Sequence, residues 1–280
     1  MVRKPNFLFI GPDKSGSTWL YEVLDWHPQA FMSRAKELFF FDQYFHLGPE
    51  WYFGHFKKAT DCHKAIGEIS HDYLYSLEAK DRIAALLPDA KLIACPREPV
   101  ERAFSSYLYM YKQGRVKAGF EQAIHEVDEL IDHGRYAKHL KPYIETFGRE
   151  SIHAPLFDAL KDDAAKFADD VFAFLNIQQI PLPPELRQPI NVASRPRSFT
   201  VARLARKLGL KVRQLGRPEI VTEIKSSALL QQVLYKEYKE GEKPRLEPSL
   251  RESLKGLFRE DVLELGELLQ LDIAAKWRYR

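Results

Sequence analysis

Short apolar runs alternate with helical patterns through most of the chain, and this alternation constrains the fold more than any other feature. Each apolar run is typical of a buried strand, and a proline follows several of the helical patterns. Strands that alternate with helices form a parallel sheet covered by helices. The sequence therefore predicts an α/β fold, a P-loop-like parallel sheet flanked by helices on both faces. We expect strands at 6–10, 64–69, 91–95 and 151–156, and helices at 17–27, 77–87, 100–112, 119–132, 135–147 and 163–175.

The sequence changes character near residue 190. The proline-rich stretch 180–189 predicts a loop, and no second pattern of strands and helices follows it. Residues 200–280 predict helices, the last of them at 250–271. We therefore expect a single domain over residues 1–280, in which residues 190–280 form a mostly helical extension packed on the rest of the domain.

The composition excludes several classes of protein. A net charge of +3 on 280 residues is too small for a general nucleic-acid binder, so we expect no nucleic-acid partner. Two cysteines form neither a disulfide framework nor a metal cluster, so we expect no metal. No apolar run reaches the roughly 18 residues of a membrane helix. Residues 1–5 lead directly into the first strand, without room for a signal peptide, so we expect a cytoplasmic protein.

The turn after the first strand has the composition of a phosphate-binding loop. It reads Gly-Pro-Asp-Lys-Ser-Gly-Ser-Thr over residues 11–18 and leads into a helix, whose first N–H groups attract an anion. Lys14 adds a full charge, and Ser17 and Thr18 add hydroxyl groups. A nucleotide triphosphatase needs a lysine directly after the second glycine of this loop, but Ser17 stands there. The loop suits one terminal phosphate without a metal; the alternative is an ordinary glycine turn before a helix.

A second basic residue follows the third expected strand. Arg97 comes directly after that strand, and Ser105 lies eight residues further on, in the next helix. Open α/β sheets bind ligands at the carboxyl ends of their strands, where Lys14 and Arg97 would both lie. Two phosphate sites at neighbouring strand ends indicate a ligand with two separated phosphates.

Four segments together resemble the sulfotransferases that use PAPS (3′-phosphoadenosine 5′-phosphosulfate), in the branch of the heparan sulfate enzymes and their bacterial relatives. The glycine loop with its helix resembles the family's 5′-phosphosulfate loop. Residues 36–42 (KELFFFD) resemble its Lys-Glu-x-His-Phe-Phe-Asp segment, and residues 67–74 (GEISHDYL) its Glu-Lys/Ser-x-Pro-x-Tyr segment. Residues 97–107 (REPVERAFSSY) resemble its 3′-phosphate motif. The four segments follow one another in the family's order.

This resemblance implies a role for each matching residue. Lys14 would contact the 5′-phosphosulfate and stabilise the leaving phosphate, while Ser15, Gly16, Ser17 and Thr18 would surround it. Arg97 and Ser105 would hold the 3′-phosphate, and Arg195 and Arg197 resemble a basic loop that closes over the cofactor. Glu68 matches the general base that takes a proton from the acceptor hydroxyl. The alternative for Glu68 is a surface or salt-bridged carboxylate.

The sequence departs from the family at two positions on the acceptor side. Phe39 stands where the family often has histidine, and His71 stands where proline is usual, close to Glu68. Either His71 offsets the lost imidazole and takes part in catalysis, or it is an exposed loop residue. The acceptor therefore stays open among a small molecule, a glycan and a lipid.

Two further stretches bear on the acceptor. The nine aromatic residues at 39–56 predict either core or the wall of an acceptor cleft. Residues 194–217 carry eight lysines and arginines and no acid. An apolar stripe runs through 199–217, and it predicts either a solvated helix packed on the core or a contact with an anionic acceptor or a membrane surface. The stripe consists of Val201, Leu204, Leu208, Val212 and Leu215.

Three functions fit these observations. The first is a sulfotransferase that moves a sulfuryl group from PAPS to a hydroxyl of a carbohydrate, a lipid or a small metabolite and releases 3′,5′-ADP; an amine acceptor also stays open. The second is a nucleotide kinase with a degenerate P-loop, which the absence of a lysine after Gly16 disfavours. The third is a nucleotide-binding or membrane-associated protein without catalytic activity.

Overall fold

A computed structural model describes residues 3–187, 194–238, 242 and 244–279. The chain divides into two compact units. The first comprises residues Met1–Arg97 and His139–Ile190, and the second Glu98–Lys138 and Asn191–Arg280. That the two units act as one domain stays a prediction.

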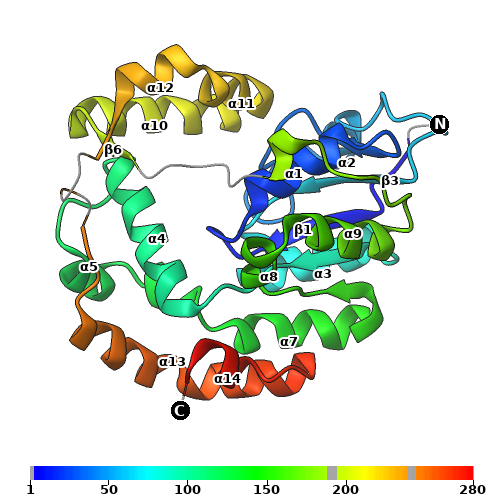
Figure 1. The fold of residues 1–280 in the computed structure, drawn as a ribbon. Helices are drawn as coiled ribbons and strands as arrows, with labels where there is room; N and C mark the ends of the chain where they lie inside the picture. Colours follow the sequence, from blue (N-terminus) through cyan, green and yellow to red (C-terminus); the bar gives the residue numbers. More distant parts are fainter. Residues whose placement is uncertain (1–2, 188–193, 239–241, 243, 280) are drawn as a thin grey trace. The chain divides into compact units, whose positions relative to one another are not determined.

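The first unit contains a five-stranded sheet in which all strands are parallel (Figure 1). Its order is β2-β3-β1-β4-β5, so the central strand β1 lies between β3 and β4. The strands are β1 (Phe7–Gly11), β2 (Ala30–Met32), β3 (Ala65–Ile69), β4 (Lys91–Ala94) and β5 (Ile152–His153). The expected α/β fold with a P-loop-like parallel sheet is confirmed.

Both faces of this sheet are covered. Alternate residues of β1, Phe7 and Phe9, pack in one core with apolar side chains of α1 (Ser17–Trp26) and α9 (Ala164–Leu175). Helices α3 (Leu77–Leu86) and α7 (Tyr136–Phe147) lie on the other side (Figure 1). The remaining helical segments of this unit are η1 (Phe45–Leu47), α2 (Pro49–Gly54), η2 (Tyr73–Tyr75), η3 (Arg149–Ser151), α8 (Phe157–Asp162) and η4 (Pro184–Arg187).

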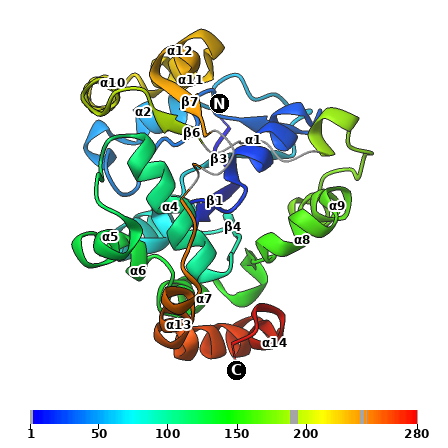
Figure 2. The same ribbon diagram turned by 60° about the vertical axis from the view of Figure 1, so that its left-hand side comes forward.

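The second unit is mostly helical, as expected for the extension, but it also contains a small sheet. Strands β6 (Ser194–Pro196) and β7 (Tyr235–Glu237) pair antiparallel, so the expectation of helices throughout 200–280 is wrong at β7. The helices are α4 (Pro99–Lys112), α5 (Phe120–Glu126), α6 (Glu129–Asp132), α10 (Phe199–Gln214), α11 (Pro218–Ser226), α12 (Ala228–Leu234), α13 (Pro248–Leu269) and α14 (Ile273–Trp277). Helices α10, α11 and α12 lie together, and α12 lies beside β7 (Figure 2).

Further differences from the sequence expectations concern two strands, one helix and one loop. The edge strand β2 was not expected, because three residues are too short to show a period. The fourth expected strand ends after His153, since Pro155 cannot donate a ladder hydrogen bond. The helix expected over 119–132 is two helices, separated at the extended residue Val127. The loop expected over 180–189 contains η4, and residues 188 and 189 lie outside the described part of the chain.

No helix within the described residues is long and apolar enough to cross a membrane.

Candidate functional site

The glycine loop connects β1 to α1, and its two glycines are needed for packing. Gly11 has a φ of +146°, and a Cβ atom there would lie 2.5 Å from the carbonyl oxygen of His71. Gly16 has a φ of +84°, and a Cβ atom there would lie 2.7 Å from Leu160. A side chain at either position would collide with these neighbours, so only glycine permits this path of the backbone.

Helix α1 begins in a way that suits an anion. Its N-cap is Gly16, which offers no side-chain hydrogen bond, and its first turn contains no acidic residue. The first N–H groups of a helix have no partner within the helix, and its dipole places partial positive charge there. Ser15 is buried and its hydroxyl donates to the carbonyl of Asp13, 3.3 Å away. Ser17 and Thr18 are half-buried in this first turn.

Arg97 lies against the loop, although 83 residues separate it from Lys14. Its Nη1 atom donates to the carbonyl oxygen of Lys14 over 2.9 Å. The guanidinium also lies over the ring of Phe157, 5.0 Å from the centroid. The structure thus brings Lys14 and Arg97 together just beyond the ends of β1 and β4.

The segment from Lys36 to Asp42 joins the same edge of the sheet. Lys36 donates to the hydroxyl of Thr18 in the loop. The N–H of Glu37 donates to the carbonyl of Ile69, the last residue of β3, over 2.9 Å. This segment therefore lies beside the loop at the carboxyl end of the sheet.

Backbone strain marks the same place. Among the described residues other than glycine, six have a positive φ, and three of these are helix C-caps. The other three are Lys14 (62°), Glu37 (66°) and Phe39 (49°). Conformations of this kind cost free energy and cluster at functional sites. The strain therefore points to the loop and the segment 36–42 as a candidate active site.

Glu68 lies inside the protein rather than beside an open cleft. Its side chain is fully buried on β3, where the hydroxyls of Ser70 and Tyr73 donate to the two carboxylate oxygens over 2.6 and 2.7 Å. Burial raises the pKa of Glu68 to about 6, and these hydrogen bonds limit the rise. The carboxylate is thus enclosed in this structure, and the general-base role that the family resemblance implies for Glu68 stays a prediction.

The Glu68 network instead supports the segment above it. The hydroxyl of Ser70 accepts the N–H of Phe39 over 3.0 Å, and the hydroxyl of Tyr73 accepts that of Phe40 over 2.9 Å. Each hydroxyl therefore connects the buried carboxylate to the backbone that follows Glu37. The network holds this strained backbone in place.

Glu37 is a candidate that the sequence analysis did not single out. Its Oε1 atom lies 3.7 Å from Nδ1 of His71, and the two side chains are 15% and 20% exposed. On its other side, Nε2 of His71 lies 3.4 Å from Oδ1 of Asp72. The imidazole thus lies between two carboxylates at the edge of the sheet. Recognition of β2 could have indicated Glu37, since it would have placed residues 36–37 just beyond a strand end.

Phe39 is a further neighbour of His71. The ring of Phe39 packs edge-on against the imidazole, with centroids 5.4 Å apart. The structure thus brings together the two positions at which the sequence departs from the family. Asp42 interacts with Asp72, and burial together with the charge of Asp72 raises the pKa of Asp42 to about 7.

The aromatic residues that follow Phe39 are mainly core. Phe40, Phe41, Tyr52 and Phe56 are fully buried, and Phe40 stacks on Tyr52 with centroids 4.5 Å apart. The core interpretation of this stretch is confirmed for these residues.

The second unit contains the remaining residues that were predicted to bind the cofactor. Ser105 lies half-buried on α4. In β6, Arg195 donates to a carboxylate oxygen of Glu242 over 2.6 Å. Nε of Arg197 donates to the carbonyls of Gln232 and Tyr235, 2.8 and 3.1 Å away. These arginines brace the small sheet, and their roles toward a cofactor, like that of Ser105, stay predictions.

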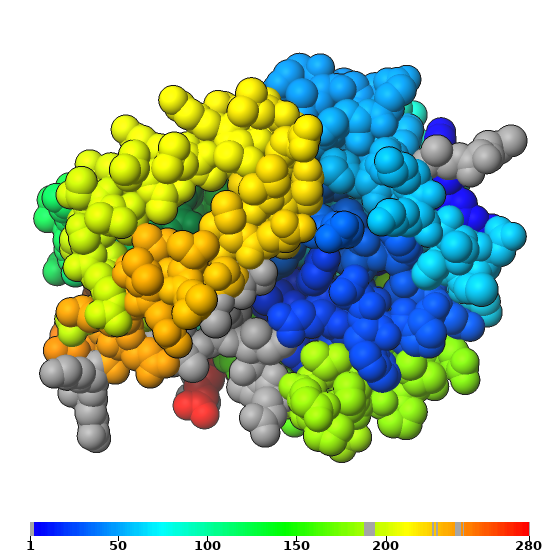
Figure 3. Space-filling model, turned by 90° about the horizontal axis from the view of Figure 1, so that it is seen from above, coloured from blue at the N-terminus to red at the C-terminus, as the bar shows by residue number. Residues whose placement is uncertain are grey.

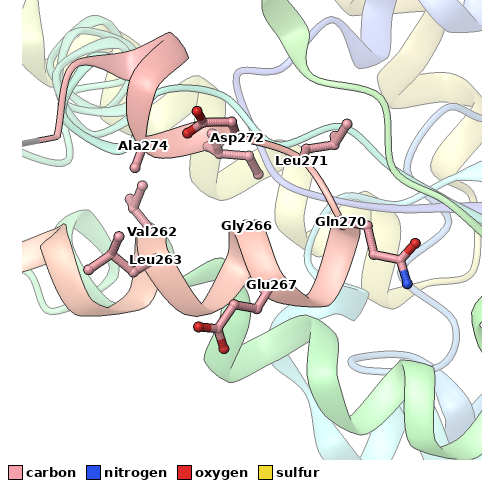
Figure 4. A pocket seen from close by; sticks show the side chains of 9 residues that line it. Val262, Leu263, Gly266, Glu267, Gln270, Leu271, Asp272 and Ala274 are labelled. Carbon is pink, nitrogen blue, oxygen red and sulfur yellow. The ribbon is translucent and has the colours of Figure 1, made fainter.

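A shallow groove of about 380 Å³ lies between α13 and α14 (Figure 4). None of the predicted site residues lines it. Within the described part of the chain, no group of three or more His, Cys, Asp or Glu side chains could hold a metal ion.

Comparison with known proteins gives this site its context. The chain is 37% identical over 150 residues to the membrane-associated sulfotransferase kil1 of Dictyostelium discoideum, and the alignment covers 49% of this chain and 32% of kil1. It is 30% identical over 185 residues to mouse heparan sulfate glucosamine 3-O-sulfotransferase 3A1, covering 63% of this chain and 47% of that enzyme. The chain thus spans between a third and a half of the length of these relatives.

Solved structures share the fold. The crystal structure of a sulfotransferase from Alicyclobacillus acidocaldarius superposes with a TM-score of 0.71 at 24% identity, covering 99% of this chain and all of that one. Mouse sulfotransferase SULT7A1, solved in complex with PAP, gives a TM-score of 0.53 at 16% identity, with 96% and 88% of the two chains covered. At these identities the likeness concerns the fold. The family model of the sulfotransferase domain matches residues 4–194, and the chain therefore belongs to the sulfotransferase family.

Proposed function

We propose that the protein transfers a sulfuryl group from PAPS to a hydroxyl group of a carbohydrate, a lipid or a small metabolite, and releases 3′,5′-ADP. The observation that carries this proposal is the convergence of Lys14, Arg97 and the uncapped start of α1 at one edge of the sheet. A partly exposed carboxylate and an imidazole, Glu37 and His71, lie at the same edge.

The residues present suit an anionic donor of this kind. Lys14 and Arg97 supply two positive charges, and the first turn of α1 contains no acid that would repel a phosphate. Gly16, with its positive φ, permits the turn that leads from the loop into α1, whose first N–H groups suit an anion. We assign the 5′-phosphosulfate to Lys14 and residues Ser15–Thr18, and the 3′-phosphate to Arg97 and Ser105.

When bound, PAPS supplies a sulfuryl group attached to a phosphate leaving group. As the acceptor oxygen bonds to sulfur and the bond from sulfur to the phosphate oxygen breaks, negative charge grows on that phosphate. Lys14 and the N–H groups of α1 stabilise this charge. The proton of the acceptor hydroxyl goes to a carboxylate on the acceptor side.

For that carboxylate we favour Glu37 over Glu68. Glu37 is partly exposed and lies beside the loop, where a hydroxyl could reach it, whereas Glu68 is enclosed and already accepts two hydrogen bonds from hydroxyl groups. His71, 3.7 Å away, helps to orient the Glu37 carboxylate. Glu68 then acts as a positioning residue that supports the backbone beyond Glu37.

The acceptor is the least defined part of the proposal. One relative, the mouse heparan sulfate 3-O-sulfotransferase 3A1, is named for transfer to a glycan hydroxyl, and this supports a hydroxyl on a sugar as the first acceptor to test. A screen of acceptors with radiolabelled PAPS measures transfer of the sulfuryl group. It should include small metabolites, lipids and amines besides sugars. A cytoplasmic location stays a prediction.

Calorimetry with 3′,5′-ADP and with ATP–Mg²⁺ tests the donor assignment. We expect 3′,5′-ADP to bind and ATP–Mg²⁺ to bind much more weakly. Arg97→Ala should weaken 3′,5′-ADP binding about 30-fold, because a phosphate loses a charge-assisted partner. Arg149→Ala, a change elsewhere in the same unit, serves as the control. Tight binding of ATP–Mg²⁺ without binding of 3′,5′-ADP would support a nucleotide kinase instead.

A further inference from the structure

Helix α10 exposes the side chains that a helix usually buries. Its apolar stripe faces outward: Val201, Leu204 and Leu208 are 50%, 57% and 55% exposed, and Leu215, just after the helix, is 79% exposed. The opposite face packs inward through small residues, since Ala202 is buried and a Cβ atom on Gly209 would touch Val221 of α11. Val212, the remaining residue of the stripe, is half-buried. The alternative in which the stripe packs on the core is therefore wrong for the four exposed residues.

Exposed apolar side chains are concentrated in this part of the chain. Ten of the fifteen large apolar side chains that the described residues expose lie between Val201 and Val233. Besides the stripe they include Leu210 on α10, Ile220 and Ile224 on α11, and Leu229, Leu230 and Val233 on α12. These three helices lie at the surface in the space-filling view of Figure 3, coloured yellow to orange. Surfaces this rich in apolar side chains mark sites of interaction.

A row of basic residues borders the stripe. Lys207 and Lys211 are exposed one turn apart on α10, directly beside Leu204 and Leu208 on the helix surface. Arg217 follows, also exposed. The whole stretch 199–217 contains six lysines and arginines and no acid, so no acidic residue of this stretch offsets the charge of the row. An apolar stripe flanked by lysines is the pattern of helices that lie in the interface of an anionic membrane.

We propose that α10, together with α11 and α12, binds the surface of an anionic lipid bilayer. Leu204, Leu208 and their apolar neighbours would enter the boundary between headgroups and acyl chains. Lys207, Lys211 and Arg217 would contact the phosphate groups of anionic lipids. The charge of Lys207, Lys211 and Arg217 favours this occupant over a neutral apolar partner, because these exposed basic residues beside the stripe would meet negative charge in anionic headgroups and none in a neutral interface.

Flotation of the full chain with lipid vesicles tests this proposal. We expect binding to vesicles of phosphatidylcholine with phosphatidylglycerol, and much weaker binding to phosphatidylcholine alone. Leu204→Gln/Leu208→Gln should lower the partition coefficient at least tenfold, since it removes apolar contact. Lys207→Gln/Lys211→Gln should lower binding to the anionic vesicles about 25-fold and remove most of the preference for them, at about fivefold for each basic residue.

The control is Leu257→Gln/Leu263→Gln, which changes two comparably exposed leucines on α13. It should bind vesicles like the wild type. Thermal melts of all variants must match, because these side chains are exposed. Failure of the wild type to bind anionic vesicles would overturn the proposal, as would an equal loss in the control.

A second copy of the chain is the competing occupant. Light scattering coupled to size exclusion distinguishes it: a dimer that Leu204→Gln/Leu208→Gln dissociates, with no vesicle binding by the wild type, would assign this surface to self-association. We expect a mass independent of these substitutions. Binding of 3′,5′-ADP by every variant shows separately that the donor site is intact, so the membrane proposal can fail while the proposed function stands.

Discussion

Two regions reverse the usual rule that polar side chains are exposed and apolar side chains are buried. They are the carboxyl-end side of the parallel sheet and helix α10. In the first region, the carboxylate of Glu68 is fully buried and accepts hydrogen bonds from two hydroxyl groups. On α10, Leu204 and Leu208 are exposed, while Arg213 of the same helix is buried. A buried charge and an exposed apolar surface are both informative, because each costs free energy. The first supports a strained backbone; the second is retained, we infer, for a partner.

The largest expected effect separates the two carboxylates of the sheet edge. Glu37→Gln should lower kcat at least a hundredfold with 3′,5′-ADP binding intact, since loss of a general base typically costs about 10²–10⁴ in rate. Glu68→Gln should lower kcat less than about tenfold, and so should His71→Ala. The measurement is steady-state turnover of PAPS with an accepted hydroxyl substrate. The reverse ranking of the two glutamates would restore Glu68 as the base.

The next effect concerns the loop. Lys14→Ala should lower kcat about 10²–10³-fold and weaken 3′,5′-ADP binding by much less, because the charge on the leaving phosphate is greatest in the transition state. Lys161→Ala provides a matched control, since that lysine lies over the same Phe157 ring as Arg97 but carries no proposed role. If Lys14→Ala changed only the KM for PAPS, the leaving-group role would be refuted.

The buried charge itself predicts a pH dependence of stability. The pKa of Glu68 is about 6 in the folded protein, against an ordinary value of 4.5. The folded state therefore favours the protonated form of Glu68. The resulting contribution to the free energy of unfolding is complete below pH 4.5 and is lost as the pH rises through about 6. The loss amounts to about 2 kcal/mol, at 1.36 kcal/mol for each pKa unit.

Glu68→Gln cannot ionise and should lack this loss. Urea unfolding of the wild type and of Glu68→Gln between pH 4 and 7 measures it, because the difference in their free energies of unfolding should change by about 2 kcal/mol. A difference that stays constant over this range would show that the carboxyl keeps an ordinary pKa in the folded state.

The smallest effects test the orientation of α10. Ala202→Leu should destabilise the protein by about 1–3 kcal/mol, because it adds volume to a packed face. Leu204→Ala, two residues away, should change the free energy of unfolding by less than about 0.5 kcal/mol, since its side chain is exposed. Chemical denaturation measures both. If Leu204→Ala were the more damaging change, the helix would pack through its leucines and the membrane surface would not exist.

Much of the fold was predictable because its signals are local. Strand β1, the glycine turn and α1 follow one another within twenty residues, and each has its own period or turn chemistry. Three of the four expected strands match β1, β3 and β4 closely. The short strands β2, β6 and β7 were missed, since three residues are stabilised by their neighbours in a sheet rather than by their own pattern.

The sequence by itself determined which residues could share a face: the glycine loop with its lysine, the arginine at a strand end, and the stripe of α10. Tertiary structure alone decided where those faces point. It enclosed Glu68 and left Glu37 at the edge beside His71, contacts that join residues 34 positions apart. It also turned the leucines of α10 outward. Periodicity records the relation of side chains within one element, whereas burial depends on elements distant in the chain, and no local pattern contains them.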